Sequence, residues 1–295
     1  MLVESVATPF TDVVTHHGEG PVWDEEGTLR CVDLLAGDVL TVPLDGSAPT
    51  RRHLGDVAAV WRPRTRGGAV VAREHDLVLL AADGSVEQQV PVVEDRQAEH
   101  GGIRLNEGGC DPAGRFWVGS MPCDETRPAG TLYRVDPDLT VTAVLGGLTI
   151  PNGLAWSADG RVAFHADSPT RVVSRLVVDE AGDLVEREPW LDLDALDVDG
   201  YPDGLTVDAA GGVWVALWGA GSVVRCEDAP GGPVATHRVR VPASQTSAVA
   251  LEPGGTRLAI TTSAKQLAPG AEPLAGALFT ARAPFPGVPV RPFAG

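Results

Sequence analysis

The sequence predicts an all-β protein: a six-bladed β-propeller with a central channel, built as a single domain over residues 1–295. Three observations indicate this fold class: a short motif recurs six times, glycine and proline are abundant, and no long amphipathic helix is apparent. Glycine and proline supply 35 and 24 of the 295 residues, which is typical of many turns between short elements. Hydrophobic residues make up 43% of the chain, enough for a folded core and too many for a disordered protein.

The recurring motif consists of a glycine, three mostly apolar residues, an aspartate or serine, two further residues and a second glycine. Its copies, in chain order, span residues 20–27, 59–67, 107–114, 153–160, 204–211 and 248–255. The copy at 59–67 is degenerate and the copy at 248–255 is weak. Each copy precedes a β-rich run, and these runs cover residues 28–34, 68–72, 115–119, 161–165, 212–217 and 257–262.

The copies start about 40–50 residues apart, the usual length of a propeller blade with four short strands. The fourth copy shows all four predicted strands, which cover residues 154–157, 161–166, 172–178 and 184–190. Turn sequences such as Ala158-Asp-Gly separate them. A four-stranded sheet cannot bury both faces by itself, so six sheets packed around one axis account for the pattern. A pair of packed sheets or another solenoid is the alternative architecture.

The start of each innermost strand is the predicted functional site, because these starts meet at one mouth of the channel. The equivalent positions hold Glu19, Ala59 or a neighbour, Asn106, Asn152, Asp203 and Ser247. One asparagine or aspartate there would indicate no more than a turn. Several carboxylate and amide oxygens that converge on one point predict a site for a hard cation such as Ca²⁺, Mg²⁺ or Mn²⁺.

Charge, cysteine content and missing motifs exclude several function classes. Lysine and arginine total 23 and aspartate and glutamate total 40, and the net charge of −17 argues against nucleic acid and anionic membranes. The chain has neither a run of about 18 apolar residues nor a signal-peptide pattern, so we expect no membrane span and a cytoplasmic location. The four cysteines form no CxxC pair and are expected to be free, mostly buried thiols. Nucleophile-elbow, HExxH, P-loop and GxGxxG motifs are absent from the sequence.

Five motifs resemble the regucalcin / gluconolactonase / luciferin-regenerating-enzyme (senescence marker protein-like) family. They are His17-Gly-Glu-Gly-Pro-Val-Trp-Asp24, Arg104-Leu-Asn106, Asp111-Pro-Ala-Gly-Arg-Phe-Trp-Val-Gly-Ser-Met121, Pro151-Asn-Gly-Leu-Ala-Trp-Ser157 and Pro202-Asp-Gly-Leu-Thr-Val-Asp208. The resemblance extends from about residue 15 to about residue 265 and keeps the order of the motifs. It implies a six-bladed propeller with one divalent metal in the channel mouth, and hydrolysis of sugar lactones.

The same resemblance implies roles for the oxygen-bearing residues. Glu19, Asn152 and Asp203 are the implied metal ligands. Asp203 is also the implied general base or the group that orients it, with Glu19 as the alternative base. The metal remains open among Ca²⁺, Zn²⁺, Mg²⁺, Mn²⁺ and Fe²⁺, because oxygen ligands suit several of these ions.

The implied substrate-binding residues are Arg104, Asn106 and Glu107. Glu107 stands where the family pattern Arg-x-Asn-Asp-Gly has an aspartate, and an interblade salt bridge is the alternative role for Arg104. A shortened loop after Met121 holds Glu125, whose role stays open. His165 is expected to be a structural imidazole whose nitrogens have hydrogen-bond partners, and an approach to the channel is the alternative.

These inferences predict a metal-dependent hydrolase that opens a sugar lactone, such as glucono-, xylono- or arabinono-lactone, to the aldonic acid. The expected partner is therefore a small-molecule lactone, with neither nucleic acid nor membrane, and the protein is expected to be a monomer or weak dimer. The alternatives are a non-catalytic propeller that binds a divalent metal or ligand, and a hydrolase of another ester or lactone.

Overall fold

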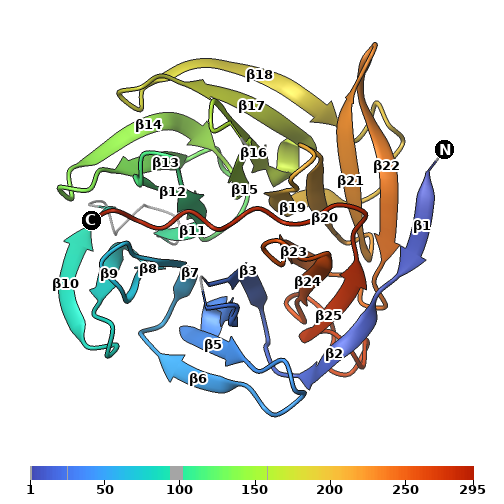
Figure 1. The fold of residues 1–295 in the computed structure, drawn as a ribbon, viewed down its shortest axis with the longest axis horizontal. Coiled ribbons are helices and arrows are strands. Elements are labelled where there is room, and N and C mark those ends of the chain that lie inside the picture. The colour runs from blue at the N-terminus through green and yellow to red at the C-terminus, as the bar shows by residue number, and fades with distance from the viewer. Residues whose placement is uncertain (1, 25, 94–101, 158) are drawn as a thin grey trace.

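The computed structural model describes residues 2–24, 26–93, 102–157 and 159–295. Within these ranges the chain forms 25 β-strands and two short 3₁₀-helices, η1 (Leu34–Ala36) and η2 (Ser168–Thr170). The strands assemble into six sheets arranged around a central axis (Figure 1). This arrangement confirms the predicted six-bladed β-propeller. No helix in the described ranges has the length and apolar character needed to cross a membrane.

The first three blades follow the chain from the innermost to the outermost strand. Blade 1 contains β3 (Gly18–Trp23), β4 (Leu29–Asp33), β5 (Asp38–Val42) and β6 (Thr50–His53). Blade 2 contains β7 (Ala58–Pro63), β8 (Ala69–Arg73), β9 (Asp76–Leu80) and β10 (Val86–Pro91). Blade 3 contains β11 (Ile103–Cys110), β12 (Phe116–Pro122), β13 (Gly130–Val135) and β14 (Val141–Leu148).

The last three blades continue in the same order. Blade 4 contains β15 (Pro151–Trp156), β16 (Val162–Asp167), β17 (Val172–Val178) and β18 (Leu184–Asp192). Blade 5 contains β19 (Tyr201–Val207), β20 (Val213–Trp218), β21 (Ser222–Ala229) and β22 (Gly232–Arg240). Blade 6 contains β23 (Thr246–Leu251), β24 (Arg257–Thr262) and β25 (Ala277–Arg282).

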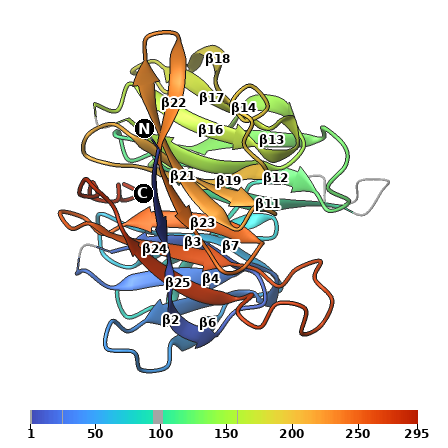
Figure 2. The same ribbon diagram turned by 90° about the vertical axis from the view of Figure 1, so that its right-hand side faces the viewer.

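Segments from the start of the chain complete the ring. β2 (Thr8–Val13) is the outermost strand of blade 6 and runs antiparallel to β25. β1 (Val3–Val6) pairs in parallel with β22 and adds a fifth strand to blade 5. Figure 2 shows the N-terminal segment running along the outer edge of these two blades. Blade 6 is therefore built from both ends of the sequence.

The repeat motif corresponds to the turn between the first two strands of a blade. In blade 5, Asp208 Oδ1 accepts hydrogen bonds from the amides of Ala210 and Gly212, at 3.0 and 2.9 Å. Gly211 has a φ of 86°, a left-handed conformation that glycine adopts without steric cost. These two requirements explain the aspartate and the closing glycine of the motif.

Large tryptophan side chains fill the space between blades. Trp117 and Trp214 occupy equivalent positions on the second strands of blades 3 and 5, and both are almost fully buried, as is Trp23 on the innermost strand of blade 1. Trp117 of blade 3 meets Trp156 of blade 4 edge to face, with ring centroids 5.8 Å apart. The tryptophans thus serve mainly in interblade packing. All four cysteines are free thiols; three are buried and Cys123 is exposed, which agrees with the prediction.

The segment 283–295, here called the C-terminal strap, crosses one face of the ring from blade 6 to blade 2 (Figure 1). Gly287 forms bridges with Asp208 of blade 5 and Pro253 of blade 6, and Phe293 pairs with Arg64 of blade 2. The Phe293 ring is fully buried against Phe116, with centroids 6.2 Å apart. The strap lies beside the carboxyl-terminal ends of the innermost strands, at one mouth of the channel. The starts of these strands form the opposite mouth.

Candidate active site

All six innermost strands contain a bulge at the position predicted to carry the site. Regular pairing with the second strand is interrupted between Glu19 and Val22, Ala58 and Val60, Leu105 and Gly108, Asn152 and Leu154, Pro202 and Leu205, and Thr246 and Ala248. A bulge bends the strand and redirects the side chains within it. The repeated bulge therefore turns the polar residues of several blades towards one mouth of the channel.

The glycines after two of these residues allow the innermost strands to approach each other closely. A Cβ atom on Gly153 would lie 2.4 Å from the carbonyl oxygen of Asp203 on the next blade. A Cβ atom on Gly204 would lie 2.3 Å from the Cβ of Ala248, again on the next blade. Any larger residue would have to push adjacent blades apart, so glycine at these positions keeps the mouth narrow.

The mouth of the channel is a cavity of about 280 Å³. Five of the predicted site residues line it, and they come from blades 1, 3, 4 and 5: Glu19, Arg104, Asn106, Asn152 and Asp203. Glu125 also lines this cavity, so the short loop after Met121 reaches the site. Trp218, at the end of β20, lines it as well. The structure thus brings together residues that are up to 184 positions apart in the sequence.

Two carboxylates lie almost fully buried in this cavity. Glu19 is 5% exposed and Asp203 is 4% exposed. Burial raises the pKa of Glu19 well above its usual value, and the nearby Asp203 and Glu107 raise it further. Burial also raises the pKa of Asp203, with an added contribution from Glu107. Two ionised carboxylates in this place require a nearby cation.

A chain of hydrogen bonds crosses the floor of the cavity from blade 3 to blade 5. Arg104 Nη1 donates to Asn106 Oδ1 at 2.7 Å, and Asn106 Nδ2 donates to Asn152 Oδ1 at 2.7 Å. Asn152 Nδ2 then donates to Ser168 Oγ at 2.8 Å, and this hydroxyl donates to the Pro202 carbonyl at 2.7 Å. The chain fixes both asparagine amides and ends at the residue before Asp203.

Arg104 is a buried cation in this cavity. Its side chain belongs to a residue that is 6% exposed, and Nη1 also donates to the Leu105 carbonyl at 3.1 Å. Among the described residues, no carboxylate lies within ion-pairing distance of its guanidinium. Burial lowers the pKa of Arg104, although Glu125 and Glu19 partly oppose this effect. The interblade salt bridge considered as an alternative is therefore not formed with a described residue, and Arg104 has donors to offer to a ligand.

Glu107 is placed differently from the other predicted substrate contacts. It is not among the described residues that line the cavity, and its carboxylate lies 3.6 Å from Arg62 Nη2 of blade 2. Arg62 also donates to the Gly108 carbonyl at 2.7 Å. Glu107 thus links two blades next to the site, and a direct contact with substrate stays a prediction.

His165 lies outside the cavity and is buried within β16. Neither ring nitrogen has a hydrogen-bond partner among the described residues. Burial lowers its pKa to about 3, and Arg187 adds to this effect. The prediction of an imidazole with satisfied nitrogens is therefore wrong among the described residues, because the ring is buried in the sheet, away from the cavity and from polar partners.

The sequence analysis missed several residues that line the cavity, among them His17, Lys265 and Gln266. His17 Nδ1 lies 2.9 Å from Ser263 Oγ, and its ring packs edge to face against Trp218 at 5.8 Å. Lys265 is the only lysine in the sequence. That rarity is the one signal in the sequence that would have singled it out.

The donor set suits a divalent cation. Asp203 Oδ1 is buried and has no hydrogen-bond partner among the described atoms, and Glu19 and Asn152 supply further oxygens in the same cavity. A cation there would offset the burial of two carboxylates. In the described part of the chain, no three histidine, cysteine, aspartate or glutamate side chains form a metal-binding group, so the asparagine oxygen would be needed.

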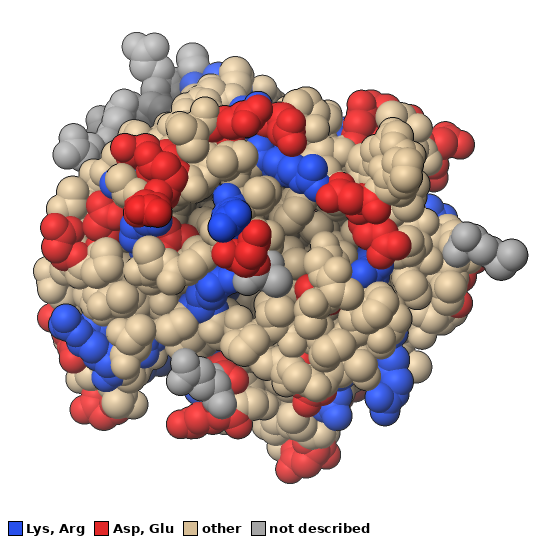
Figure 3. All heavy atoms as spheres, turned by 45° about the horizontal axis from the view of Figure 1, so that its top comes forward, with Lys and Arg blue, Asp and Glu red and all other residues tan. Residues whose placement is uncertain are grey.

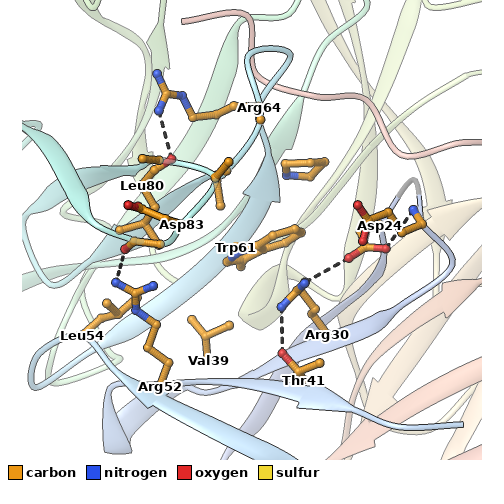
Figure 4. A pocket seen from close by; sticks show the side chains of 18 of the residues that line it. Asp24, Arg30, Val39, Thr41, Arg52, Leu54, Trp61, Arg64, Leu80 and Asp83 are labelled. Atoms are coloured by element: carbon orange, nitrogen blue, oxygen red, sulfur yellow. Dashed lines mark hydrogen bonds and ion pairs between the residues drawn. The ribbon is translucent and has the colours of Figure 1, made fainter.

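A second groove, between blades 1 and 2, has a larger volume of about 500 Å³. The arginines that line it are bonded to neighbouring groups of the protein. Arg30 donates to Asp24 at 3.1 Å and to Thr41 at 2.7 Å, and its guanidinium lies 4.9 Å from the ring centre of Trp61 (Figure 4). Arg64 pairs with Glu87 at 2.6 Å. These arginines therefore already have partners, whereas Asp203 Oδ1 in the central cavity has none among the described atoms.

Both the protein as a whole and the cavity carry an excess of acidic side chains. Acidic residues outnumber basic ones by 40 to 23, and Figure 3 shows groups of acidic side chains with basic ones set among them. The cavity likewise holds three acidic side chains, Glu19, Glu125 and Asp203, alongside the two basic side chains of Arg104 and Lys265. Both basic groups lie close to the buried carboxylates, where they partly offset the negative charge.

Comparison with known proteins identifies the family of this chain. The chain is 36% identical to the L-arabinolactonase of Azospirillum brasilense over 300 aligned residues, which cover 98% of this chain and 96% of that protein. It is 34% identical to the 6-deoxy-6-sulfogluconolactonase of Pseudomonas putida, with 94% and 95% covered. The crystal structure of a calcium-binding protein, regucalcin, from Agrobacterium tumefaciens superposes with a TM-score of 0.88 at 25% identity and covers 99% of both chains. Residues 17–264 match the SMP-30/Gluconolactonase/LRE-like region, and the chain belongs to this family.

Proposed function

We propose that this protein is a metal-dependent sugar lactonase that opens an aldonolactone to the aldonic acid. At the level of the family, the lactonases that it resembles along nearly its whole length support the enzyme class. The observation that carries the proposal is the convergence of Glu19, Arg104, Asn106, Asn152 and Asp203, from four blades, on one cavity. The carboxylates can serve as metal ligands and proton acceptor, and the fixed cation can bind oxygen atoms of the substrate.

Glu19, Asn152 and Asp203 would hold the divalent metal through their oxygen atoms. When bound, such an ion acts as a Lewis acid that polarises the ester carbonyl and stabilises the charge that develops on its oxygen. The amide of Asn152 is already oriented by Asn106 and Ser168, so its oxygen needs no further ordering. Calcium, magnesium, manganese, zinc and iron(II) remain candidate ions for this set of ligands.

Arg104 and Asp203 would act on the lactone and on the attacking water. Arg104 is held by Asn106 and the Leu105 carbonyl, and its remaining donors would bind oxygen atoms of the lactone. Asp203 would accept a proton from water as the oxygen of that water bonds to the carbonyl carbon. When the bond between that carbon and the ring oxygen breaks, the proton passes to the ring oxygen, which becomes the hydroxyl group of the product. Glu19 is the alternative base.

A lactone panel tests the activity. Purified protein is treated with a chelator, dialysed and assayed by acid release on glucono-, xylono- and arabinono-lactone, with each candidate metal added back. We expect hydrolysis of at least one lactone that the chelator abolishes and one or more metals restore. Metal uptake without hydrolysis of any lactone would instead support the binding-protein alternative. Hydrolysis that survives complete metal removal would contradict metal dependence.

Substitutions separate the roles of Asp203. Asp203→Ala and Glu19→Ala should lose most of the bound metal in elemental analysis, whereas Asp138→Asn, at an exposed turn, should keep it. Asp203→Asn retains an oxygen, and saturating metal should restore its occupancy without restoring turnover. Loss of a general base typically costs about 10²- to 10⁴-fold in rate. Recovery to within about tenfold of wild type at saturating metal would show that Asp203 is a ligand and not the base.

A further inference from the structure

The C-terminal strap covers a chamber at the far end of the channel. The chamber has a volume of about 110 Å³, and the strap contributes Val288, Pro289 and Val290 to its lining. The last residues of the innermost strands of all six blades supply most of the remaining lining. No described residue lines both this chamber and the cavity at the channel mouth, which lies at the starts of the same strands. The strap thus forms the outer wall of this end of the channel.

Two separate anchors hold the strap, one on each side of the chamber. At blade 6 the Gly287 amide donates to the Gly255 carbonyl at 3.0 Å. At blade 2 the Phe293 amide donates to the Pro63 carbonyl at 2.8 Å, and the Phe293 carbonyl accepts a hydrogen bond from the Thr65 amide at 2.9 Å. The buried ring of Phe293 adds to the second anchor. Release of either anchor breaks no hydrogen bond within the six sheets.

The part of the strap between the anchors is stiff and weakly held. From residue 288 to residue 290, no backbone group forms a hydrogen bond with a described main-chain group of the ring. Prolines restrict the backbone to extended conformations, and the strap contains four of them: Pro284, Pro286, Pro289 and Pro292. Segments with few backbone hydrogen bonds open at a lower free energy than the strands of a core. A stiff segment that is held mainly at two anchors is therefore suited to move as one unit.

We propose that the C-terminal strap is a gate on the far mouth of the channel. The Phe293 anchor releases while the six blades stay folded, and the strap turns about Gly287 and exposes the chamber to small molecules. The closed strap leaves the channel with one open mouth, and the open strap gives it a second entrance. This inference goes beyond the proposed lactonase function and does not depend on it, because it concerns the end of the channel opposite the site.

The four cysteines report on this opening without an added label. Cys110 lines the chamber and is 5% exposed, and burial raises the pKa of its thiol to about 12, so it should react slowly while the strap is closed. Cys123 is exposed, whereas Cys31 and Cys226 are buried within blades 1 and 5. The protein is treated with N-ethylmaleimide for increasing times, and mass spectrometry of its peptides gives the rate at each cysteine. We expect Cys123 to react first and Cys110 next, with Cys31 and Cys226 at least about a hundredfold slower than Cys110, at the rate of global unfolding.

Two variants distinguish local opening from unfolding of the ring. Phe293→Ala weakens one anchor and should accelerate the modification of Cys110 by at least about tenfold. Val173→Ala, at a fully buried position in β17 of blade 4, destabilises the ring and leaves the strap contacts in place. It should accelerate Cys226 by about tenfold and leave Cys110 within about twofold of wild type. Urea below the unfolding transition should likewise accelerate Cys226 far more than Cys110, because a local opening exposes little surface.

The rates at Cys110 decide the inference. If Cys110 reacted in step with Cys31 and Cys226 in the wild-type protein, the strap would open only with the whole ring and the inference would be overturned. Equal acceleration of Cys110 and Cys226 in Val173→Ala, or an unchanged rate at Cys110 in Phe293→Ala, would overturn it as well. The wild-type rates and their dependence on urea give the answer even if Phe293→Ala does not fold. Neither result bears on lactone hydrolysis, which is measured separately.

Discussion

The buried imidazole of His165 should make the stability of the fold depend strongly on pH. This side chain is 1% exposed, lies within β16, and has a pKa lowered to about 3 by burial and by Arg187. In the unfolded chain the same imidazole has its ordinary pKa of 6.5. The folded protein therefore keeps His165 neutral at pH values where the unfolded protein binds a proton. The contribution of neutral His165 to stability is therefore fully present above pH 6.5 and is lost as the pH falls from 6.5 towards 3.

The size of this effect follows from proton linkage. Between pH 8 and pH 4.5 the unfolded state gains about 3 kcal/mol relative to the folded state, because each pH unit below 6.5 contributes about 1.4 kcal/mol. His165→Leu removes the titrating group and two buried nitrogens without partners. We expect the variant to be at least as stable as wild type at pH 8, and to lose about 3 kcal/mol less than wild type on acidification to pH 4.5.

Equilibrium unfolding in urea, followed by fluorescence of the seven tryptophans at pH 8, 6.5, 5.5 and 4.5, measures this difference. An NMR titration of the histidine ring signals provides an independent measurement, because His165 should stay neutral down to pH 5. If His165→Leu retained the full pH dependence of wild type, or if the His165 signals titrated near pH 6.5, the reasoning would be refuted.

Three further predictions concern the site and the closure of the ring. Arg104→Ala should raise KM and lower kcat, with a loss of about 10- to 150-fold in kcat/KM and unchanged metal content in elemental analysis, since one charge-assisted hydrogen bond is removed. Gly153→Ala places a Cβ atom against the Asp203 carbonyl and should cost about 1–3 kcal/mol in urea unfolding, whereas Gly146→Ala, which meets no atom within 4 Å, should cost far less. Phe293→Ala removes the buried anchor of the C-terminal strap and should cost about 3–5 kcal/mol, whereas Phe285→Ala, at a half-exposed position, should cost less; calorimetry of both variants checks this.

The blades were predictable from the sequence because their signals are local. A turn aspartate that binds nearby amides and a glycine with positive φ recur within eight residues of each other, whatever the rest of the chain does. The predicted strands of blade 4 agree closely with β15 to β18. The main difference is that β15 begins at Pro151, three residues earlier than predicted, because Pro151 and Asn152 pair with Asp167 and Ala166 before the bulge. A motif that starts at the glycine does not reveal this extension.

The site was predictable only in part, because some of its contacts have no local signal. Alternation along an extended strand places Arg104 and Asn106 on one face, and their 2.7 Å hydrogen bond confirms this. The bulge between Leu105 and Gly108 then interrupts the alternation, so the direction of Glu107 does not follow from its position. Lys265 reaches the cavity from a loop with no periodic pattern. Only the assembled ring brings it to a carboxylate on the opposite blade.

The ring closure described for blade 6 also sets an order of events during synthesis. Thr8 of β2 pairs with Thr280 of β25, so the N-terminal strand has no partner in blade 6 until 272 more residues have been made. At typical translation rates of about 5–20 residues per second, this wait lasts roughly 15 to 55 s. A strand left unpaired for so long is a hazard for pairing with other chains. Pro9 and Asp12 lie within β2, and a proline that lacks an amide donor and a charged side chain both discourage such pairing until the ring closes.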